Sequence, residues 1–164
     1  MSNTVAPEIF KAYDIRGIVG ETLTESAVER IGQALGTVGK AKGVKRFVVG
    51  RDGRLSGPSL VAALTRGLNA AGMDVTDIGV CATPMVYFAT YELGTGSGVM
   101  VTGSHNPPEY NGLKMMVAGD TLASEAIQTL RKLVESGDFA SGSGKSESLD
   151  IKPAYLDQIG RAHV

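Results

Sequence analysis

The amino-acid sequence predicts an α/β domain of three layers, in which a mixed, mostly parallel sheet carries helices on both faces. Short apolar runs typical of buried strands alternate along the chain with longer segments of helical periodicity. Such alternation favours parallel strands joined by right-handed helical crossovers. Glycine contributes 22 of the 164 residues, about twice its usual share, which suits a fold with many tight turns.

The first half of the chain is expected to contain two helices with one strand between them. The sequence TLTE at 22–25 matches the capping-box pattern and opens the first helix, which ends near the glycines at 39 and 43. The run FVVG at 47–50 predicts the strand, and the second helix ends at Gly72. The apolar residues at helical spacing are Val28, Ile31, Leu35 and Val38 in the first helix and Leu60, Val61, Leu64 and Leu68 in the second.

The second half of the chain continues the alternation. Thr83 and Pro84 are typical of the N-cap and first turn of a helix. The last two strands are separated by few residues, so they are expected to pair in antiparallel fashion, which makes the sheet mixed. The expected elements are a strand at 73–79, a helix at 83–91, strands at 98–102 and 112–117, and a helix at 124–135.

Three segments make up the expected domain organisation. Residues 1–137 form the α/β domain and carry its polar loops. Residues 138–148 are rich in glycine and serine, which is typical of a linker or a mobile loop. Residues 149–164 read as the unfinished start of a following segment, so we expect the chain to be the first domain of a longer protein.

Composition excludes several classes of function. The net charge of −1 gives no general attraction for nucleic acid, so an anion must be bound by a local site. Cys81 is the only cysteine, which excludes an internal disulfide and a multi-cysteine zinc site. The start of the chain lacks a signal peptide, and no apolar run approaches the roughly 18 residues of a membrane span. We therefore expect a cytoplasmic protein without nucleic-acid or membrane partners.

The most unusual stretch is TGSHNPPEYNGLK at 102–114, which follows a predicted strand. Ligands of open α/β sheets bind beyond the carboxyl ends of the strands, so this position marks a candidate site. Gly103 would allow a tight bend that pushes the Ser104 hydroxyl outward, and a serine without an activating base is better suited to carry a phosphoryl group than to attack. Asn106 would stiffen the loop, and Lys114 could supply a proton or a counter-charge. The alternative is a plain proline-rich connection with a capping serine.

The segment GRDGRLSG at 50–57 also follows a predicted strand. Arg51 and Arg54 could hold an anion at the start of the next helix, where the backbone amides favour negative charge. A solvated turn with an ordinary N-cap explains the same residues.

The segment AYDIRG at 12–17 is expected to be a short polar loop near the N-terminus. Tyr13 and Arg16 could clamp a phosphate there. Alternatively, Arg16 pairs with Asp14 at the surface.

The string TGSHNPPEYNGLK resembles the phosphoserine loop of the α-D-phosphohexomutases. AYDIRG, GRDGRLSG and the order of elements from residue 9 to about residue 156 also resemble that family, most of all its bacterial phosphomannomutase/phosphoglucomutase type. The resemblance implies an isomerase that moves phosphate reversibly between the 1- and 6-positions of a hexose, mannose or glucose. A phosphorylated Ser104 would donate to the sugar, and the bisphosphorylated sugar would then return its other phosphate to the serine.

The resemblance also implies a role for each candidate residue. The phosphate of Ser104 would bind Mg²⁺, while Lys114 and His105 would transfer protons to and from the sugar hydroxyl. Glucose 1,6-bisphosphate would act as an activator. The family's further domains, one of which carries an aspartate-rich metal loop, have no counterpart in these 164 residues. The residues expected to bind substrate or its phosphate are Tyr13, Arg16, Arg51, Arg54 and Asn106.

Two other classes of function remain open at this point. A non-catalytic module could bind sugar phosphates or a partner protein through the same loops, and it would not need a phosphorylated Ser104. A flavodoxin-like nucleotide binder is a weaker alternative, because the chain contains neither G-x-G-x-x-G nor G-x-x-x-x-G-K-[ST].

Overall fold

The computed structural model describes residues 4–161, which form a sheet of seven strands covered by helices. The strand order is β1-β5-β4-β2-β3-β7, and β6 pairs with β5 beside this path. The strands are β1 Ile15–Ile18, β2 Arg46–Arg51, β3 Asp74–Val80, β4 Gly98–Val101, β5 Tyr110–Val117, β6 Asp120–Thr121 and β7 Ser146–Ser148. The helices are a 3-10 turn η1 Pro7–Ile9, and α1 Glu25–Ala41, α2 Gly57–Ala70, α3 Thr83–Glu92, α4 Glu125–Ser136 and α5 Lys152–Arg161.

The pairing of the strands confirms a mixed, mostly parallel sheet. β2 pairs in parallel with both β3 and β4, and β3 pairs in parallel with β7. The crossovers between these parallel strands contain α2 and α3, as parallel pairing requires. β5 runs antiparallel to β4, because a short loop at 102–109 returns the chain directly from β4. β5 also pairs in antiparallel fashion with β1.

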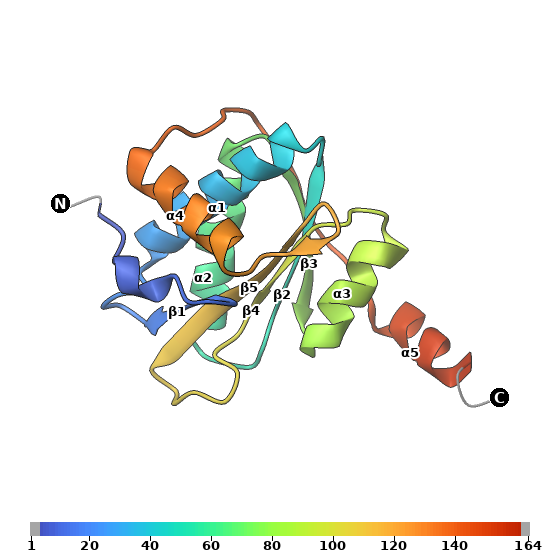
Figure 1. Ribbon diagram of the computed structural model, residues 1–164. Helices are drawn as coiled ribbons and strands as arrows, with labels where there is room; N and C mark the ends of the chain where they lie inside the picture. Colours follow the sequence, from blue (N-terminus) through green and yellow to red (C-terminus); the bar gives the residue numbers. More distant parts are fainter. Residues whose placement is uncertain (1–3, 162–164) are drawn as a thin grey trace.

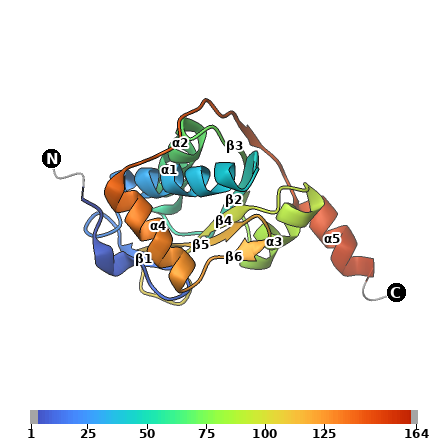
Figure 2. The ribbon, with the colours of Figure 1, turned by 45° about the horizontal axis from the view of Figure 1, so that its top comes forward.

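Helices lie on both faces of the sheet, so the expected three layers are confirmed (Figures 1 and 2). α1, α2 and α4 cover one face and share the larger core, whereas α3 and α5 lie on the other face over a smaller core. The alternation of side chains along β2 divides its residues between the two cores: Phe47 belongs to the larger and Val48 to the smaller.

Two glycines let α1 and α2 approach each other closely. A Cβ atom on Gly32 would lie 2.5 Å from the carbonyl oxygen of Leu64, and a Cβ on Gly67 would lie 2.0 Å from that of Glu29. Any larger residue at either position would therefore push the helix backbones apart.

The structure corrects two predicted N-caps. α1 begins after Thr24, whose hydroxyl accepts the amide of Ala27 at 3.1 Å, so the capping box expected at Thr22 is wrong. The Thr22 hydroxyl instead accepts the amide of Ile18 at 2.9 Å and closes the turn after β1. In α3 the N-cap is Ala82, and Thr83, which we expected in that position, is the first residue of the helix.

The N-terminal polar segment is only partly a loop. Residues Ile15–Ile18 form β1, which pairs with β5 at the edge of the sheet, with Arg16 opposite Gly112. Ile15 and Ile18 are three positions apart, so the sequence does not show the alternation of apolar and polar residues that indicates a strand.

The expected linker at 138–148 is also different in the structure, because its last residues form β7. Backbone bonds dock the preceding residues on the end of α2: the amide of Gly142 donates to Ala70 at 2.8 Å and that of Gly144 to Asn69 at 2.9 Å. Glycine and serine here serve a close approach of two backbones, which composition does not distinguish from flexibility. α5 then packs on α3 through an edge-to-face contact between the rings of Tyr155 and Phe88.

None of the helices among residues 4–161 is both long and apolar enough to cross a membrane.

Candidate functional site

The candidate site lies at the carboxyl edge of the parallel strands, where three polar segments meet. We call residues 102–109, between β4 and β5, the serine loop; it is the yellow loop at the lower edge of the sheet in Figure 1. The neighbouring strand β2 ends in the segment that carries Asp52 and Arg54. Arg16 reaches the loop from β1, where its Nη1 donates to the carbonyl oxygen of Gly103 at 2.8 Å.

Ser104 adopts a left-handed backbone conformation, with φ of 54°. Its side chain is exposed to solvent. Its amide donates to the Thr102 hydroxyl at 2.9 Å. A non-glycine residue rarely adopts this conformation unless its surroundings hold it there. The bend that we expected from Gly103 is therefore made by the serine itself.

Gly103 is required for space rather than for conformation. A Cβ atom on this residue would lie 2.2 Å from Cζ of Arg54. The Arg54 guanidinium thus packs directly on the backbone of the serine loop.

Arg54 is bonded to the serine loop through all of its outer nitrogen atoms. Nη1 donates to the carbonyl oxygens of Pro107 at 2.6 Å and Tyr110 at 2.9 Å, and Nη2 donates to those of Asn106 at 2.6 Å and Ser104 at 3.2 Å. These bonds direct the guanidinium at the loop backbone. The structure thus shows Arg54 in contact with the loop backbone, whereas the sequence led us to expect a contact with phosphate.

Asp52 connects the end of β2 to the start of the serine loop. Its Oδ2 accepts the Thr102 hydroxyl at 2.7 Å and the Gly103 amide at 3.2 Å, and it lies 3.4 Å from Nε of Arg54. Its Oδ1 accepts the Arg54 amide at 3.0 Å. Sequence reasoning missed Asp52 and Thr102. The sequence shows Asp52 only as an acidic residue between two arginines after a strand. This pattern does not reveal that its partner is Thr102, 50 positions away.

Arg16 and Lys114 lie on the same face of the sheet. Arg16 stands opposite Gly112, two residues from Lys114 on β5, so the two cations are diagonal neighbours on the face that carries α3. Nη2 of Arg16 also pairs with Asp14 at 2.5 Å, so the pairing that we considered as the alternative for Arg16 is present. No hydrogen bond or ion pair of the Lys114 side chain occurs within residues 4–161.

The side chains of the remaining candidate residues differ in exposure and in the contacts that they make. His105 Nδ1 lies 3.4 Å from Ser104 Oγ, which is longer than an ordinary hydrogen bond, and both side chains are exposed. The side-chain amide of Asn106 donates inward to the Gly103 carbonyl at 3.0 Å, so it closes the loop. Tyr13 is 77% exposed.

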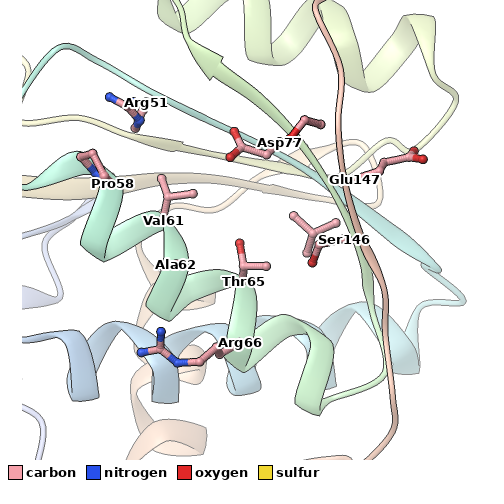
Figure 3. Close-up of a pocket in the computed structure, with 11 residues that line it drawn as sticks. Arg51, Pro58, Val61, Ala62, Thr65, Arg66, Asp77, Ser146 and Glu147 are labelled. Atoms are coloured by element: carbon pink, nitrogen blue, oxygen red, sulfur yellow. The ribbon is translucent and has the colours of Figure 1, made fainter.

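Arg51 is not brought together with Ser104. Its side chain follows Phe47 and Val49 on the α2 face of the sheet, opposite to the face of Arg16. There it lines a hollow of about 550 Å³ between α2, β3 and β7 (Figure 3). The phosphate contact expected of Arg51 is therefore not supported by its position.

Within residues 4–161, no group of three or more His, Cys, Asp or Glu side chains converges as a metal site requires. Asp52 is already occupied by the hydroxyl, amide and guanidinium described above. These residues do not form a magnesium site by themselves.

The fold and the loop define a three-layer α/β/α domain that presents Ser104, with its side chain exposed, at the carboxyl edge of its sheet. The chain belongs to the phosphoglucomutase/phosphomannomutase family: residues 7–141 match the family's α/β/α domain I. This confirms the resemblance inferred from the loop motifs.

Relatives agree with this assignment. The chain is 53% identical over 156 residues to a phosphomannomutase/phosphoglucomutase of Pseudomonas aeruginosa. The matched region covers 95% of this chain and 34% of that protein. The chain is also 53% identical over 159 residues to a phosphoglucomutase of Neisseria meningitidis serogroup B, with the same coverage. The chain thus spans about a third of the length of these curated relatives.

Solved structures confirm the fold. A crystal structure of a phosphoglucomutase/phosphomannomutase family protein from Burkholderia thailandensis superimposes with a TM-score of 0.91 at 45% identity, over 95% of this chain and 36% of that one. The structure of a phosphomannomutase homologue from Thermus thermophilus gives a TM-score of 0.85 at 31% identity, over 98% of this chain and 37% of that one.

Proposed function

We propose that this domain carries the phosphoryl group of an enzyme that interconverts the 1-phosphates and 6-phosphates of mannose, glucose or both. The observation that carries the proposal is Ser104, whose side chain is exposed while its amide and carbonyl groups are held by Thr102 and Arg54. An exposed hydroxyl on a fixed backbone suits a group that must repeatedly give and receive a phosphoryl group. The names of the relatives, phosphomannomutase and phosphoglucomutase, support the same activity.

Each half-reaction would move one phosphoryl group between Ser104 Oγ and a sugar hydroxyl. The bond from phosphorus to Oγ breaks as the bond to the sugar oxygen forms. The sugar hydroxyl gives its proton to a base, and the serine oxygen takes one up. We assign these proton transfers to His105, 3.4 Å from Oγ, and Lys114. The bisphosphorylated sugar then turns its second phosphate to Ser104, and the reverse step restores the phosphoserine.

Positive charge beside the loop would stabilise this transfer. Arg16, which donates to the Gly103 carbonyl, and Lys114 stand on one face of the sheet, and transfer between two oxygens concentrates negative charge. Mg²⁺ on the phosphoserine would add further charge, with its protein ligands drawn from the longer enzyme, and glucose 1,6-bisphosphate would charge the serine. Tyr13 would contact the substrate. We propose a cytoplasmic location for this reaction.

Phosphopeptide mapping by mass spectrometry tests the proposal. The chain is incubated with Mg²⁺ and glucose 1,6-bisphosphate, beside a Ser104→Ala control. Phosphate on Ser104 that is absent from the control is the expected result. If the serine stays bare, the full-length enzyme is treated in the same way, and phosphorylation only there means that the other domains are needed. A bare serine in both refutes the carrier role and leaves the alternative, a non-catalytic sugar-phosphate binding module.

A further inference from the structure

We propose that Asp52 and Arg54 are positioning residues for the phosphoryl carrier, acting as a clamp that fixes the backbone of Ser104. The inference rests on the proposed function of Ser104 and extends it to two residues whose side chains contact the backbone and hydroxyl groups of the serine loop. The contacts that carry it are those between the end of β2 and the serine loop.

The carrier oxygen has little support of its own. Ser104 Oγ is exposed, and the contact that the described residues make to it is the long approach of His105 Nδ1 at 3.4 Å. The direction of this hydroxyl therefore depends on the backbone that bears it. That backbone is left-handed, a conformation that L residues disfavour and that neighbouring groups must maintain.

Arg54 holds the serine loop from within. Its two Nη atoms donate to four carbonyl oxygens, from Ser104 near the start of the loop to Tyr110 at the first position of β5. Only the planar fork of an arginine offers several donors in fixed directions, whereas a lysine ammonium is a single compact charge on a flexible stem. The same guanidinium occupies the space that a side chain at Gly103 would fill.

Asp52 holds the approach to Ser104. Because the Thr102 hydroxyl donates its proton to Asp52 Oδ2, its oxygen is free to accept the Ser104 amide. The same carboxylate accepts the Gly103 amide and pairs with Arg54. Thr102 is only 5% exposed, so water does not readily replace this relay. Asp52 and Arg54 thus fix the amide and the carbonyl of the residue that carries the phosphoryl group.

This arrangement predicts how the clamp affects catalysis. Phosphoryl transfer needs the serine oxygen, the phosphorus and the sugar oxygen in line, and a misplacement of about 1 Å can lower the rate about 100-fold. Loss of the clamp should therefore lower kcat and leave KM nearly unchanged, because the contacts that hold Asp52 and Arg54 are made to the serine loop itself.

The test uses Arg54→Lys and Asp52→Asn in the full-length enzyme, with Arg66→Lys as the control. Arg66 is a partly exposed arginine of α2 that pairs with Glu29, away from the loop. We expect kcat to fall about 10- to 100-fold for the two clamp variants, with KM within about threefold of the wild type. The control should keep the wild-type values. Hydrogen exchange should show faster exchange of the Ser104 amide in both clamp variants but not in the control.

Several outcomes would overturn the clamp. A wild-type kcat in Arg54→Lys contradicts the clamp. An increase in KM without a change in kcat also contradicts it, and would indicate that Arg54 binds phosphate. Unchanged exchange of the Ser104 amide contradicts it as well. If a clamp variant does not fold, Thr102→Val replaces it, because it removes the hydroxyl relay within a side chain of similar shape. Two measurements separate failure of the clamp from failure of the proposed function. If the proposed function is wrong, Ser104 stays unphosphorylated in the wild type, and exchange of the Ser104 amide still tests the clamp.

Discussion

Replacement of Gly144 by alanine distinguishes a docked strand from a linker, because the two interpretations predict opposite signs. In the structure a Cβ atom on Gly144 would lie 1.9 Å from the carbonyl oxygen of Met73 and 2.5 Å from its carbonyl carbon. These are backbone atoms of the chain that leads into β3, so they cannot move aside without disturbing the sheet. In a linker the same change would raise the free energy of unfolding by about 0.4–1 kcal/mol, because alanine has less freedom in the unfolded chain.

The size of the loss follows from the bonds that the alanine would break. The amides of Gly142, Gly144 and Val75 take part in backbone bonds of 2.8, 2.9 and 2.8 Å that dock this segment. Each is worth about 0.5–1.5 kcal/mol net, and water would replace part of that because the segment is largely exposed. We therefore expect Gly144→Ala to lower the free energy of unfolding by about 1–3 kcal/mol, which is also the usual cost of overpacking.

Urea denaturation measures this difference, and hydrogen exchange locates it. The Val75 amide, which donates to Lys145, should lose protection in Gly144→Ala. Gly160→Ala is the matched control, because it adds the same methyl group in α5 where no atom lies within 4 Å of the new Cβ. It should leave stability unchanged or slightly higher. A Gly144→Ala protein as stable as the wild type, with Val75 still protected, would refute the docking of β7.

Three further predictions concern other parts of the chain. Gly67→Ala favours helix by about 1 kcal/mol in an isolated segment, but here its Cβ would meet the Glu29 carbonyl, so denaturant unfolding should show a protein destabilised by about 3 kcal/mol or more. A gain in stability would contradict the close crossing of α1 and α2. In the full-length enzyme, Lys114→Met should lower kcat far more than it raises KM, whereas equal changes in both would indicate simple phosphate binding. Burial raises the pKa of the Cys81 thiol, so alkylation by iodoacetamide near pH 8 should be several-fold slower than that of a free cysteine and should speed up as the pH rises; a rate equal to that of free cysteine would show that the thiol is not protected.

The helices and inner strands could be predicted from the sequence because their signals are local. Phe47 to Gly50 form a compact apolar run, and the helical spacing from Val28 to Val38 needs no knowledge of the rest of the chain. The edge strands were missed for the same reason. β1 has four residues and β7 has three exposed ones, so neither shows a hydrophobic pattern, and both exist because a neighbouring strand offers unpaired backbone groups.

In the candidate site, too, local motifs could be predicted from the sequence, whereas contacts between distant residues could not. A distinctive string of residues in the sequence pointed to the serine loop, and the roles predicted for Ser104, His105 and Lys114 come from that string. The roles of the arginines depended on side-chain direction. Arg51 and Arg54 are three positions apart and looked equivalent, yet one lies on the α2 face and the other packs on the Gly103 backbone.

The sequence by itself determined the class of fold, the succession of its inner elements and the family to which the loop belongs. These depend on periodicity and on contiguous motifs, which are properties of neighbouring residues. Only the tertiary structure decided that Asp52 and Arg54 hold Ser104, because strand order brings together segments about 50 positions apart and no local pattern encodes that order. The same pairing of strands placed Arg16 beside Lys114 and turned a glycine-rich segment into the edge of the sheet.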